Sequence, residues 1–450
     1  MRQRKRHPAL LDAACIALAL SVLQAHAEPA LPVNAAVEKT SAISLGEVIR
    51  LADENNPHLL ASQHNYALSE LDIKRANRFP NPQLNVYGGY GKTTTLLGNP
   101  QFVGLTQLLE TGGKRKARVL QARARHYLMD AEYESRRWDI RMMARQAYVD
   151  LAVAQRHYDF LSAATGQLDE IVQAAKQRFE AGAVPEAELI QARHFRRLVE
   201  PQRITALSDI ENAQTRLNNL TGYKLPLLFQ ADESELLPPL HGTPGNVRLA
   251  DIPPLDLLLE KAYQARRDIL IANRKADVAK SEIRLNKAYR VPDLEVMSGY
   301  MFVNTVSPIT ESTQKDFFHG GFTQINVELP LFHSGREEVQ KAQISLKQAQ
   351  QEFEAVRNDI RAEVSQAYAS WKADRDNLLL YRESILPAEE EARRIIQREY
   401  REGKADLFSA VSAQQNLQQA QQSYLNAITQ YYNAISALER AIGTPVSGTD

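Results

Sequence analysis

Apolar residues along the chain follow two different spacings. Over long stretches they recur every three or four positions, as in the seams from Leu161 to Phe179 and from Val356 to Trp371, and this spacing predicts amphipathic helices. Over short stretches apolar and polar residues alternate, as they do from Thr323 to Leu331, and this spacing predicts strands with two different faces. The chain is therefore predicted to be mainly α with a small β part.

These patterns predict two sets of elements. The first set is a helix over 45–79, strands over 82–91 and 101–110, a long helix over 114–181 and a helix over 186–221. The second set is a helix over 255–290, strands over 292–303 and 319–332, a long helix over 336–402 and a helix over 405–442. Pro80 and Pro292 end the first helix of each set, because proline cannot continue the helical hydrogen bonds. Gly182 and Gly403 are expected to make the hairpin turns after the long helices.

The two sets are copies of one unit. The stretch N-P-Q-L-N-V-Y-G-G-Y after the first helix matches V-P-D-L-E-V-M-S-G-Y, 210 positions later. The stretch R-F-E-A-G, which ends at Gly182, matches E-Y-R-E-G, which ends at Gly403, 221 positions later. Such matches in one order predict an internal two-fold repeat, with units over 44–222 and 255–443.

The predicted lengths exclude a compact globule. A helix of about 67 residues spans roughly 100 Å at 1.5 Å per residue. The two shorter helices of each copy, placed end to end, match that length. We therefore expect an elongated, coiled-coil-like barrel or rod. The segment 223–254 contains six prolines and no helical period, so it is either an ordered equatorial linker around the waist of this rod or a flexible tether.

The N-terminus has the features of a secretory signal peptide. A basic cap and an apolar stretch precede an A-H-A cleavage site that ends at Ala27, which gives a signal peptide over 1–27. Cys15 is the only cysteine and lies inside the apolar stretch, so we expect no lipid anchor and no disulfide in the mature chain. An N-terminal periplasmic segment over 28–43 and a C-terminal tail over 444–450 then flank the repeats.

Composition excludes several classes of function. The 54 Lys and Arg balance the 54 Asp and Glu, and loss of the signal peptide leaves a net charge of about −3, which argues against a nucleic-acid binder. The mean hydropathy of −0.39 argues against a bundle of membrane helices. No acid–base pair, nucleophile or phosphate loop stands out, and the histidines lack the paired spacing of metal ligands. We therefore expect no enzyme, no catalytic residue, no cofactor and no metal site.

The four strands argue for an oligomer. An exported chain with strands near the 9–11 residues that cross an outer membrane is expected to place them there. Four strands cannot close a barrel, and open edges in lipid leave costly unpaired backbone groups. Two chains would supply eight strands and three would supply twelve, and only the larger barrel leaves a pore.

The sequence resembles the TolC-like outer-membrane efflux proteins from Leu45 to Gly443. The resemblance rests on the N-P-Q-L-N-V-Y-G-G-Y stretch, on Leu108 to Arg118, on the A-G-A-V-P turn and on the closing L-T-G. Within Leu108 to Arg118, the stretch E-T-G-G-K-R-K-A is most similar to the heavy-metal branch, the Czc-type cobalt-zinc-cadmium outer-membrane factors.

The resemblance implies a homotrimer in the outer membrane of a Gram-negative cell. Its twelve-stranded β-barrel would continue into an α-helical periplasmic barrel, and it would conduct cobalt, zinc, cadmium or similar cations passively. A periplasmic adaptor (membrane-fusion) protein and an inner-membrane proton-driven pump of the resistance–nodulation–division type are the implied partners. Drug efflux and type I protein secretion are alternative functions, and a soluble periplasmic coiled-coil scaffold or adaptor is an alternative from another class.

The resemblance also points to a gate at the periplasmic tip. In the family, an acidic residue near the first hairpin turn pairs with a basic residue near the second. Glu188 takes the acidic position here, but Ala405 takes the basic one, and Ser409 and Ser412 stand where further acidic residues often ring the pore. Solvated tip charges are the competing interpretation. The remaining candidates for a rewired latch are Arg401, Lys404 and Asp406.

Three helix breakers are expected at one height above the tip. Gly166 lies 16 residues before the turn at Gly182, and Pro201 lies 16 residues after Pro185, so both stand about 24 Å from the tip. Pro387 takes the place of Gly166 in the second copy. These residues either bend the helices and narrow the tunnel or are accommodated locally.

A basic run opens the first long helix, against the direction of the helix dipole. An anionic phospholipid surface beneath the barrel is the expected partner of this run. Its members are Lys114, Arg115, Lys116, Arg118, Arg123 and Arg125.

Overall fold

The computed structural model describes residues 41–88, 99–226, 229–232, 252–306, 315–332 and 334–446. The chain divides into two units, Met1–Ser41 and Ala42–Asp450, and nearly every described residue belongs to the second. The expected signal peptide lies outside the described residues.

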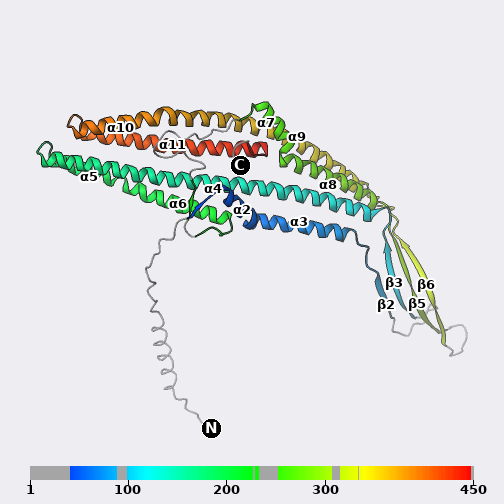
Figure 1. The fold of residues 1–450 in the computed structure, drawn as a ribbon. Coiled ribbons are helices and arrows are strands. Elements are labelled where there is room, and N and C mark those ends of the chain that lie inside the picture. The colour runs from blue at the N-terminus through cyan, green and yellow to red at the C-terminus, as the bar shows by residue number, and fades with distance from the viewer. Residues whose placement is uncertain are drawn as a thin grey trace, which may run out of the picture. The chain divides into compact units, whose positions relative to one another are not determined.

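The described elements are mostly helices (Figure 1). The first copy holds α2 (Leu45–Asn55), α3 (Pro57–Ala76), β2 (Gln83–Tyr87), β3 (Asn99–Leu109), α4 (Lys114–Glu180), α5 (Glu186–Arg197) and α6 (Glu200–Leu220). The second holds α7 (Leu255–Ala265), α8 (Arg267–Tyr289), β5 (Leu294–Val306), β6 (Lys315–Val327), α9 (Arg336–Leu380), the π-helical turn η2 (Tyr381–Ile385), α10 (Leu386–Arg401) and α11 (Leu407–Ile442). The short strands β1 (Ser41–Ile43) and β4 (Phe229–Ala231) pair with each other.

Helix α4 is the element around which the others pack. It has 67 residues, about 100 Å of helix, and it contacts α3 and α6 of its own copy and α8 and α11 of the other. Tyr148 of α4, Leu217 of α6 and Tyr431 of α11 are buried in the largest apolar cluster. Beside it, Arg145 of α4 pairs with the buried Glu439 of α11. Among the described helices, none is both long and apolar enough to cross a membrane.

The part of the linker that the structure describes packs against α4. Phe229 in β4 is buried, and the backbone N–H of Ala231 donates to Gln155 Oε1 at 3.1 Å. The hydroxyl of Tyr148 donates to the carbonyl oxygen of Ile43 in β1 at 2.9 Å. This part of the linker is therefore ordered, whereas residues 233–251 lie outside the described residues.

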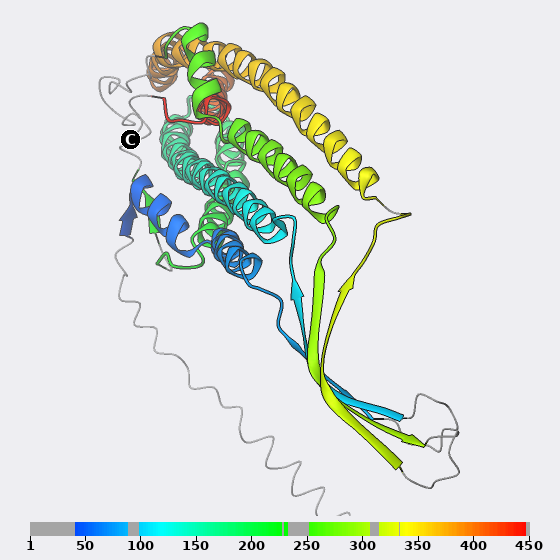
Figure 2. The ribbon, with the colours of Figure 1, turned by 90° about the vertical axis from the view of Figure 1, so that its right-hand side faces the viewer.

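The two strand pairs form one antiparallel sheet in the order β2-β3-β5-β6, which extends from one end of the helices (Figure 2). The prediction of a strand over 319–332 is wrong at its end, because β6 stops at Val327. Val327 pairs with Leu294, the first residue of β5, so no partner lies beyond it. Pro330 also lacks the N–H that a ladder needs.

The predicted single helices over 45–79 and 255–290 are also wrong. Each is interrupted by one residue of extended backbone, Asn56 with ψ 122° and Arg266 with ψ 124°. At the first break, Asn56 Oδ1 accepts hydrogen bonds from the N–H groups of the next helix and Pro57 takes the first helical position. Arg266 has neither a capping side chain nor a proline.

Each break holds the end of the last helix of its copy. In the first copy Gly222, with φ 63°, follows α6 and lies against the break so closely that a Cβ there would be 2.6 Å from the carbonyl oxygen of Asn55. The side-chain amide of Asn56 donates to the carbonyl oxygen of Leu220 at 2.9 Å. The break thus satisfies a carbonyl that the helix end leaves unpaired.

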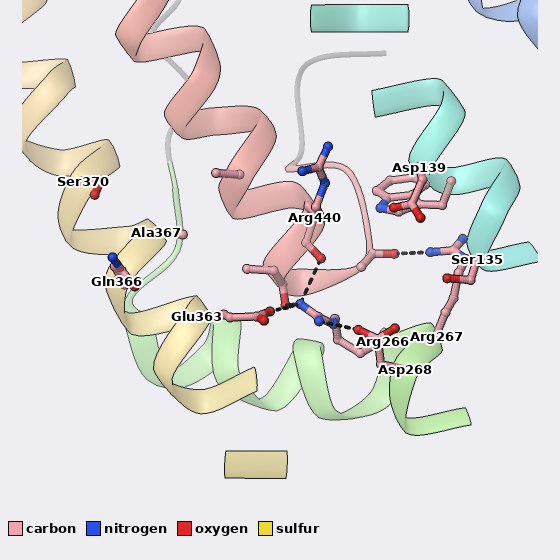
Figure 3. A pocket seen from close by; sticks show the side chains of 14 residues that line it. Ser135, Asp139, Arg266, Arg267, Asp268, Glu363, Gln366, Ala367, Ser370 and Arg440 are labelled. Carbon is pink, nitrogen blue, oxygen red and sulfur yellow. Dashed lines mark hydrogen bonds and ion pairs between the residues drawn. The ribbon is translucent and has the colours of Figure 1, made fainter. Parts of the chain in front are cut away.

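The second copy builds the same joint with arginines (Figure 3). Gly443, with φ 84°, ends α11, and a Cβ there would be 3.0 Å from the carbonyl oxygen of Ala265. Arg266 Nη1 donates to the carbonyl oxygens of Arg440 and Ala441, each at 3.2 Å, and Arg267 Nη1 donates to that of Gly443 at 2.9 Å. In the second copy, two guanidinium groups thus donate to the carbonyl oxygens at the helix end, where the first copy uses the side-chain amide of Asn56.

The first joint gives a test. The change Gly222→Ala should lower the free energy of unfolding by about 1–3 kcal/mol more than Gly182→Ala, because both glycines have positive φ but only Gly222 meets backbone. Apparent melting temperatures from circular dichroism compare the two variants with the unaltered protein. Equal losses of stability would contradict a close-packed joint.

Candidate functional site

Two helix hairpins, α4 with α5 and α10 with α11, each close with the same kind of turn. Gly182 and Gly403 have φ 73° and 78°, which favours glycine, and no atom lies within 4 Å of a Cβ built on either. The N–H of Gly182 donates to the carbonyl oxygen of Phe179 at 2.8 Å, and that of Gly403 donates to Tyr400 at 3.1 Å. These bonds belong to the Schellman arrangement that closes a helix end. Both turns lie at the end of the helices away from the sheet (Figure 1).

A buried tyrosine joins the two hairpins. The hydroxyl of Tyr400, on α10, donates to Glu188 Oε1 of α5 at 2.9 Å. Arg178, on α4, holds Nη1 at 3.4 Å from the same carboxylate oxygen and its guanidinium carbon 4.7 Å from the centre of the tyrosine ring. Burial raises the pKa of Tyr400 above its usual range and the bond to Glu188 acts in the same direction, so the hydroxyl stays a donor. We call Arg178, Glu188 and Tyr400 the tip cluster.

A second link lies one turn before Tyr400 on α10, further from the hairpin turn. Gln397 Nε2 donates to Glu170 Oε2 of α4 at 2.9 Å, while Arg393 Nη1 donates to Gln397 Oε1 at 2.7 Å. Arg401 Nη2 lies 4.0 Å from the same Glu170 oxygen, and both of these charged side chains are more than half exposed. Solvent screening makes this outer pair weak, so the amide contact is the firmer link.

The structure separates the predicted latch residues into two groups. Glu188 and Arg401 reach from one hairpin to the other. Lys404 instead pairs with Glu402 at 2.6 Å within its own turn. Asp406 caps α11 by accepting from the N–H of Ser409 at 2.7 Å, and hydrogen bonding by Ser409 holds the pKa of Asp406 below its usual range. Lys404 and Asp406 therefore act locally.

Sequence reasoning missed Tyr400, although the repeat contains a signal for it. Tyr400 takes the place of Phe179, 221 positions earlier, and both stand three residues before a turn glycine. Phe179 is partly exposed, whereas Tyr400 is buried. A hydroxyl in the second copy where the first has none indicates a polar partner in the interior.

The three predicted helix breakers differ in their surroundings. The predicted helix over 186–221 is interrupted by a turn at Leu198 and Val199, and Pro201 is the second residue of α6 after it. Pro387 is the second residue of α10, and α10 begins directly after η2. Gly166 lies inside α4, which continues without a break. A taper at this height stays a prediction.

The sheet has one strongly apolar face. Cross-strand partners lie on the same side of a sheet, and the register pairs Leu84 with Leu105 and Val86 with Val103. Eight apolar side chains on this side, which define the apolar sheet face, are between 37% and 70% exposed, and the polar Ser298 and Thr323 lie on the same side. The eight apolar residues are Leu84, Val86, Val103, Leu105, Tyr300, Phe302, Ile325 and Val327.

The opposite side of the sheet is mixed. Asn85 Nδ2 donates to the buried Thr106 Oγ1 at 2.6 Å, and Gln324 Nε2 donates to Asn326 Oδ1 at 2.8 Å. Aromatic rings also pack there, since Phe102 contacts Phe322 with their centroids 5.7 Å apart. Neighbouring positions on one strand therefore meet different surroundings. In the part of the chain that the structure describes, no group of three or more His, Cys, Asp or Glu is placed to hold a metal ion.

Known proteins share this arrangement. The family model for outer membrane efflux proteins matches residues 48–223 and 258–444, one match in each copy. The cobalt-zinc-cadmium resistance protein CzcC of Cupriavidus metallidurans is 24% identical over 409 residues, 90% of this chain and 91% of that protein. The outer membrane protein TolC of Vibrio cholerae is 24% identical over 77% of this chain and 78% of its own length. The solved CmeC outer membrane channel of Campylobacter jejuni is similar with a TM-score of 0.68 and 19% identity, over 89% of this chain and 85% of that one.

Proposed function

Because the chain belongs to the outer membrane efflux protein family, we propose that it is the channel subunit of a tripartite resistance–nodulation–division pump that exports heavy-metal cations. It is an efflux channel of the outer membrane and not an enzyme. The pump supplies the energy, and the cations pass through the channel passively. A periplasmic adaptor joins the channel to the inner-membrane pump.

The observation that carries the channel proposal is the exposed apolar sheet face. In the described residues β2 and β6 each have a partner on one side only, so the four strands leave two open edges. In lipid, each unpaired backbone group at an open strand edge costs several kcal/mol. Three chains that join β6 to the next β2 remove every edge and give twelve strands, with the apolar sheet face outward and the mixed face around a pore.

The choice of heavy-metal cations rests on likeness to CzcC, which extends over 90% of this chain where TolC of Vibrio cholerae extends over 77%. The E-T-G-G-K-R-K-A stretch behind the predicted branch forms the junction between β3 and α4. Glu110 there pairs with Arg118, and Lys114 Nζ lies 2.7 Å from Asp293 Oδ1. These residues brace the junction, so selection of the cation belongs to the pump. Export of drugs is the alternative.

The tip cluster is proposed as the latch of the channel. Separation of the hairpins must break the bond between Tyr400 and Glu188, and a hydrogen bond to a charged group is worth about 1.5–3 kcal/mol. Arg178 and Glu188 belong to the same hairpin, so the guanidinium still balances the charge of the carboxylate after the two hairpins separate. The latch thus joins a buried tyrosine to an ion pair.

The membrane placement is tested on two neighbouring residues of β6. Ile325 lies on the apolar sheet face and Gln324 on the other side. We expect Ile325→Arg to abolish trimers in outer-membrane fractions, because an arginine facing lipid costs about 2–4 kcal/mol per strand position. The matched change Gln324→Arg should leave trimer yield close to normal on heat-dependent gel migration. Equal yields from both variants would contradict the assigned lipid face.

The latch is tested in planar lipid bilayers. Tyr400→Phe and Glu188→Ala should each raise the open fraction at low voltage about tenfold or more, the effect of losing a bond worth at least 1.4 kcal/mol. Lys404→Gln removes a charge of the same tip whose partner is local, and it should leave conductance unchanged. Unaltered closed-state conductance in both latch variants would overturn the proposal.

The cargo is tested by growth. Deletion of the gene should lower the tolerated concentrations of zinc, cobalt and cadmium several-fold, with smaller effects for hydrophobic drugs, and a plasmid copy should restore growth. The Ile325→Arg copy should fail to restore it. Sensitivity to drugs without sensitivity to any of these metals would replace the proposed cargo and leave the channel function standing.

A further inference from the structure

A cavity of about 360 Å³ lies between α3, α4 and α8, at the end of these helices that adjoins the sheet. Arginines dominate its charged lining, which holds three of them and one aspartate. Tyr289 is the last residue of α8, and α4 contributes residues from its first three to four turns. The residues that matter here are Asp72, Arg75, Arg118, Gln121, Arg125 and Tyr289.

The basic run at the start of α4 divides into residues with and without internal partners. Lys114 is buried, with Nζ 2.7 Å from Asp293 Oδ1 and 5.7 Å from the centre of the Tyr289 ring. The guanidinium of Arg115 lies over the ring of Phe79 at 4.1 Å. Lys114 and Arg115 are therefore occupied in the junction between strands and helices.

The arginines that line the cavity differ in whether their guanidinium groups have a partner. Arg118 Nη2 donates to Glu110 Oε2 at 2.9 Å, so this side chain is fixed in position. Among the described residues, the side chains of Arg75 and Arg125 have no hydrogen-bond or ion-pair partner. Because Arg118 is paired with Glu110, Asp72 offers a single carboxylate against the two exposed guanidinium groups of Arg75 and Arg125, which leaves the lining with an excess positive charge.

This geometry suits one chemical class of ligand. Guanidinium groups present N–H donors in a planar fork that matches the oxygens of phosphate, and converging like charges are stabilised by a bound anion. Gln121 and the Tyr289 hydroxyl add neutral polar groups to the same wall. A phosphate group is small enough for the cavity and brings several acceptor oxygens.

We propose that this arginine pocket binds a phosphate-bearing anion. The phosphate belongs either to the headgroup of an anionic lipid or to a soluble phosphate. The lipid source rests on the proposed function, which places the sheet in the membrane and the pocket beneath it. Arg125, the twelfth residue of α4, stands about 17 Å from the start of that helix. The soluble source requires no membrane.

The test uses the full chain, purified in a zwitterionic detergent, as three proteins. The pocket variant is Arg75→Gln with Arg125→Gln. The control variant is Lys116→Gln with Arg123→Gln, which removes two exposed positive charges from the same region outside the cavity. Far-UV circular dichroism and trimer migration on gels establish that the three proteins are equally folded.

Two arms separate the sources. In the soluble arm, inorganic phosphate is titrated by calorimetry. In the lipid arm, the proteins are reconstituted with phosphatidylcholine containing one fifth phosphatidylglycerol, and native mass spectrometry counts the retained anionic lipid. In whichever arm shows binding, we expect the pocket variant to bind about 30-fold more weakly, because each of the two arginines contributes about 1 kcal/mol. The control variant should change less than threefold.

The outcomes decide the proposal. Variant-dependent binding in the lipid arm alone assigns a headgroup, and such binding in the soluble arm assigns free phosphate. No binding in either arm, or equal losses in the pocket and control variants, would overturn the pocket. If the pocket variant does not fold, Arg75→Lys with Arg125→Lys keeps the charge without the planar fork and should still lose several-fold in affinity. Failure of the wild-type chain to form outer-membrane trimers would overturn the channel function but leave the phosphate titration unaffected.

Discussion

The architecture depends on two joints in which the end of one helix is held by the break in another. Gly222 lies against Asn55, where a Cβ would be 2.6 Å from the carbonyl oxygen, and Gly443 lies against Ala265, where a Cβ would make a tight contact of 3.0 Å. The joints fix where the last helix of each copy ends relative to the first, so two short helices can lie end to end beside the 67 residues of α4. That alignment places the hairpin turns at one end and the sheet at the other, which a channel with a membrane part and a distant tip requires.

The two breaks also explain where the sequence could and could not predict this fold. Long helices, strands and turn glycines follow from apolar spacing and from the repeat, because those signals are local. The first break carries a local signal too, since Asn56 caps and Pro57 starts the next helix. Arg266 carries none, and its extended backbone is held by bonds to the end of α11, 174 residues away. In the sequence, the second break is indicated only by the repeat, because Arg266 stands 210 positions after Asn56.

The candidate latch was predictable to a similar degree. Charged residues near the turns are visible in the sequence, and Glu188 was found among them. Which of them act across the hairpins depends on burial, and burial is a tertiary property. Tyr400 is enclosed by both hairpins, so its hydroxyl must find a partner inside the protein, and Glu188 is the acceptor within reach. Asp406 also lies in a charged stretch, but its carboxylate accepts a hydrogen bond from the N–H of Ser409 and so caps its own helix.

The two copies differ at the start of their long helices. Gly113 and Gly335 precede α4 and α9 in the same left-handed conformation. Helix α9 then carries Glu337 and Glu338 in its first turn, which the helix dipole favours. Helix α4 has no acidic residue in its first turn and begins with three cations, each of which costs about 0.3–1 kcal/mol in that position. Ion pairing with Asp293 offsets this cost for Lys114, and the ring of Phe79 lies against the guanidinium of Arg115. Arg118 and Arg125 follow in the next turns of α4 and line the arginine pocket, whereas no residue of α9 lines it, so only the long helix with the basic run contributes to this pocket.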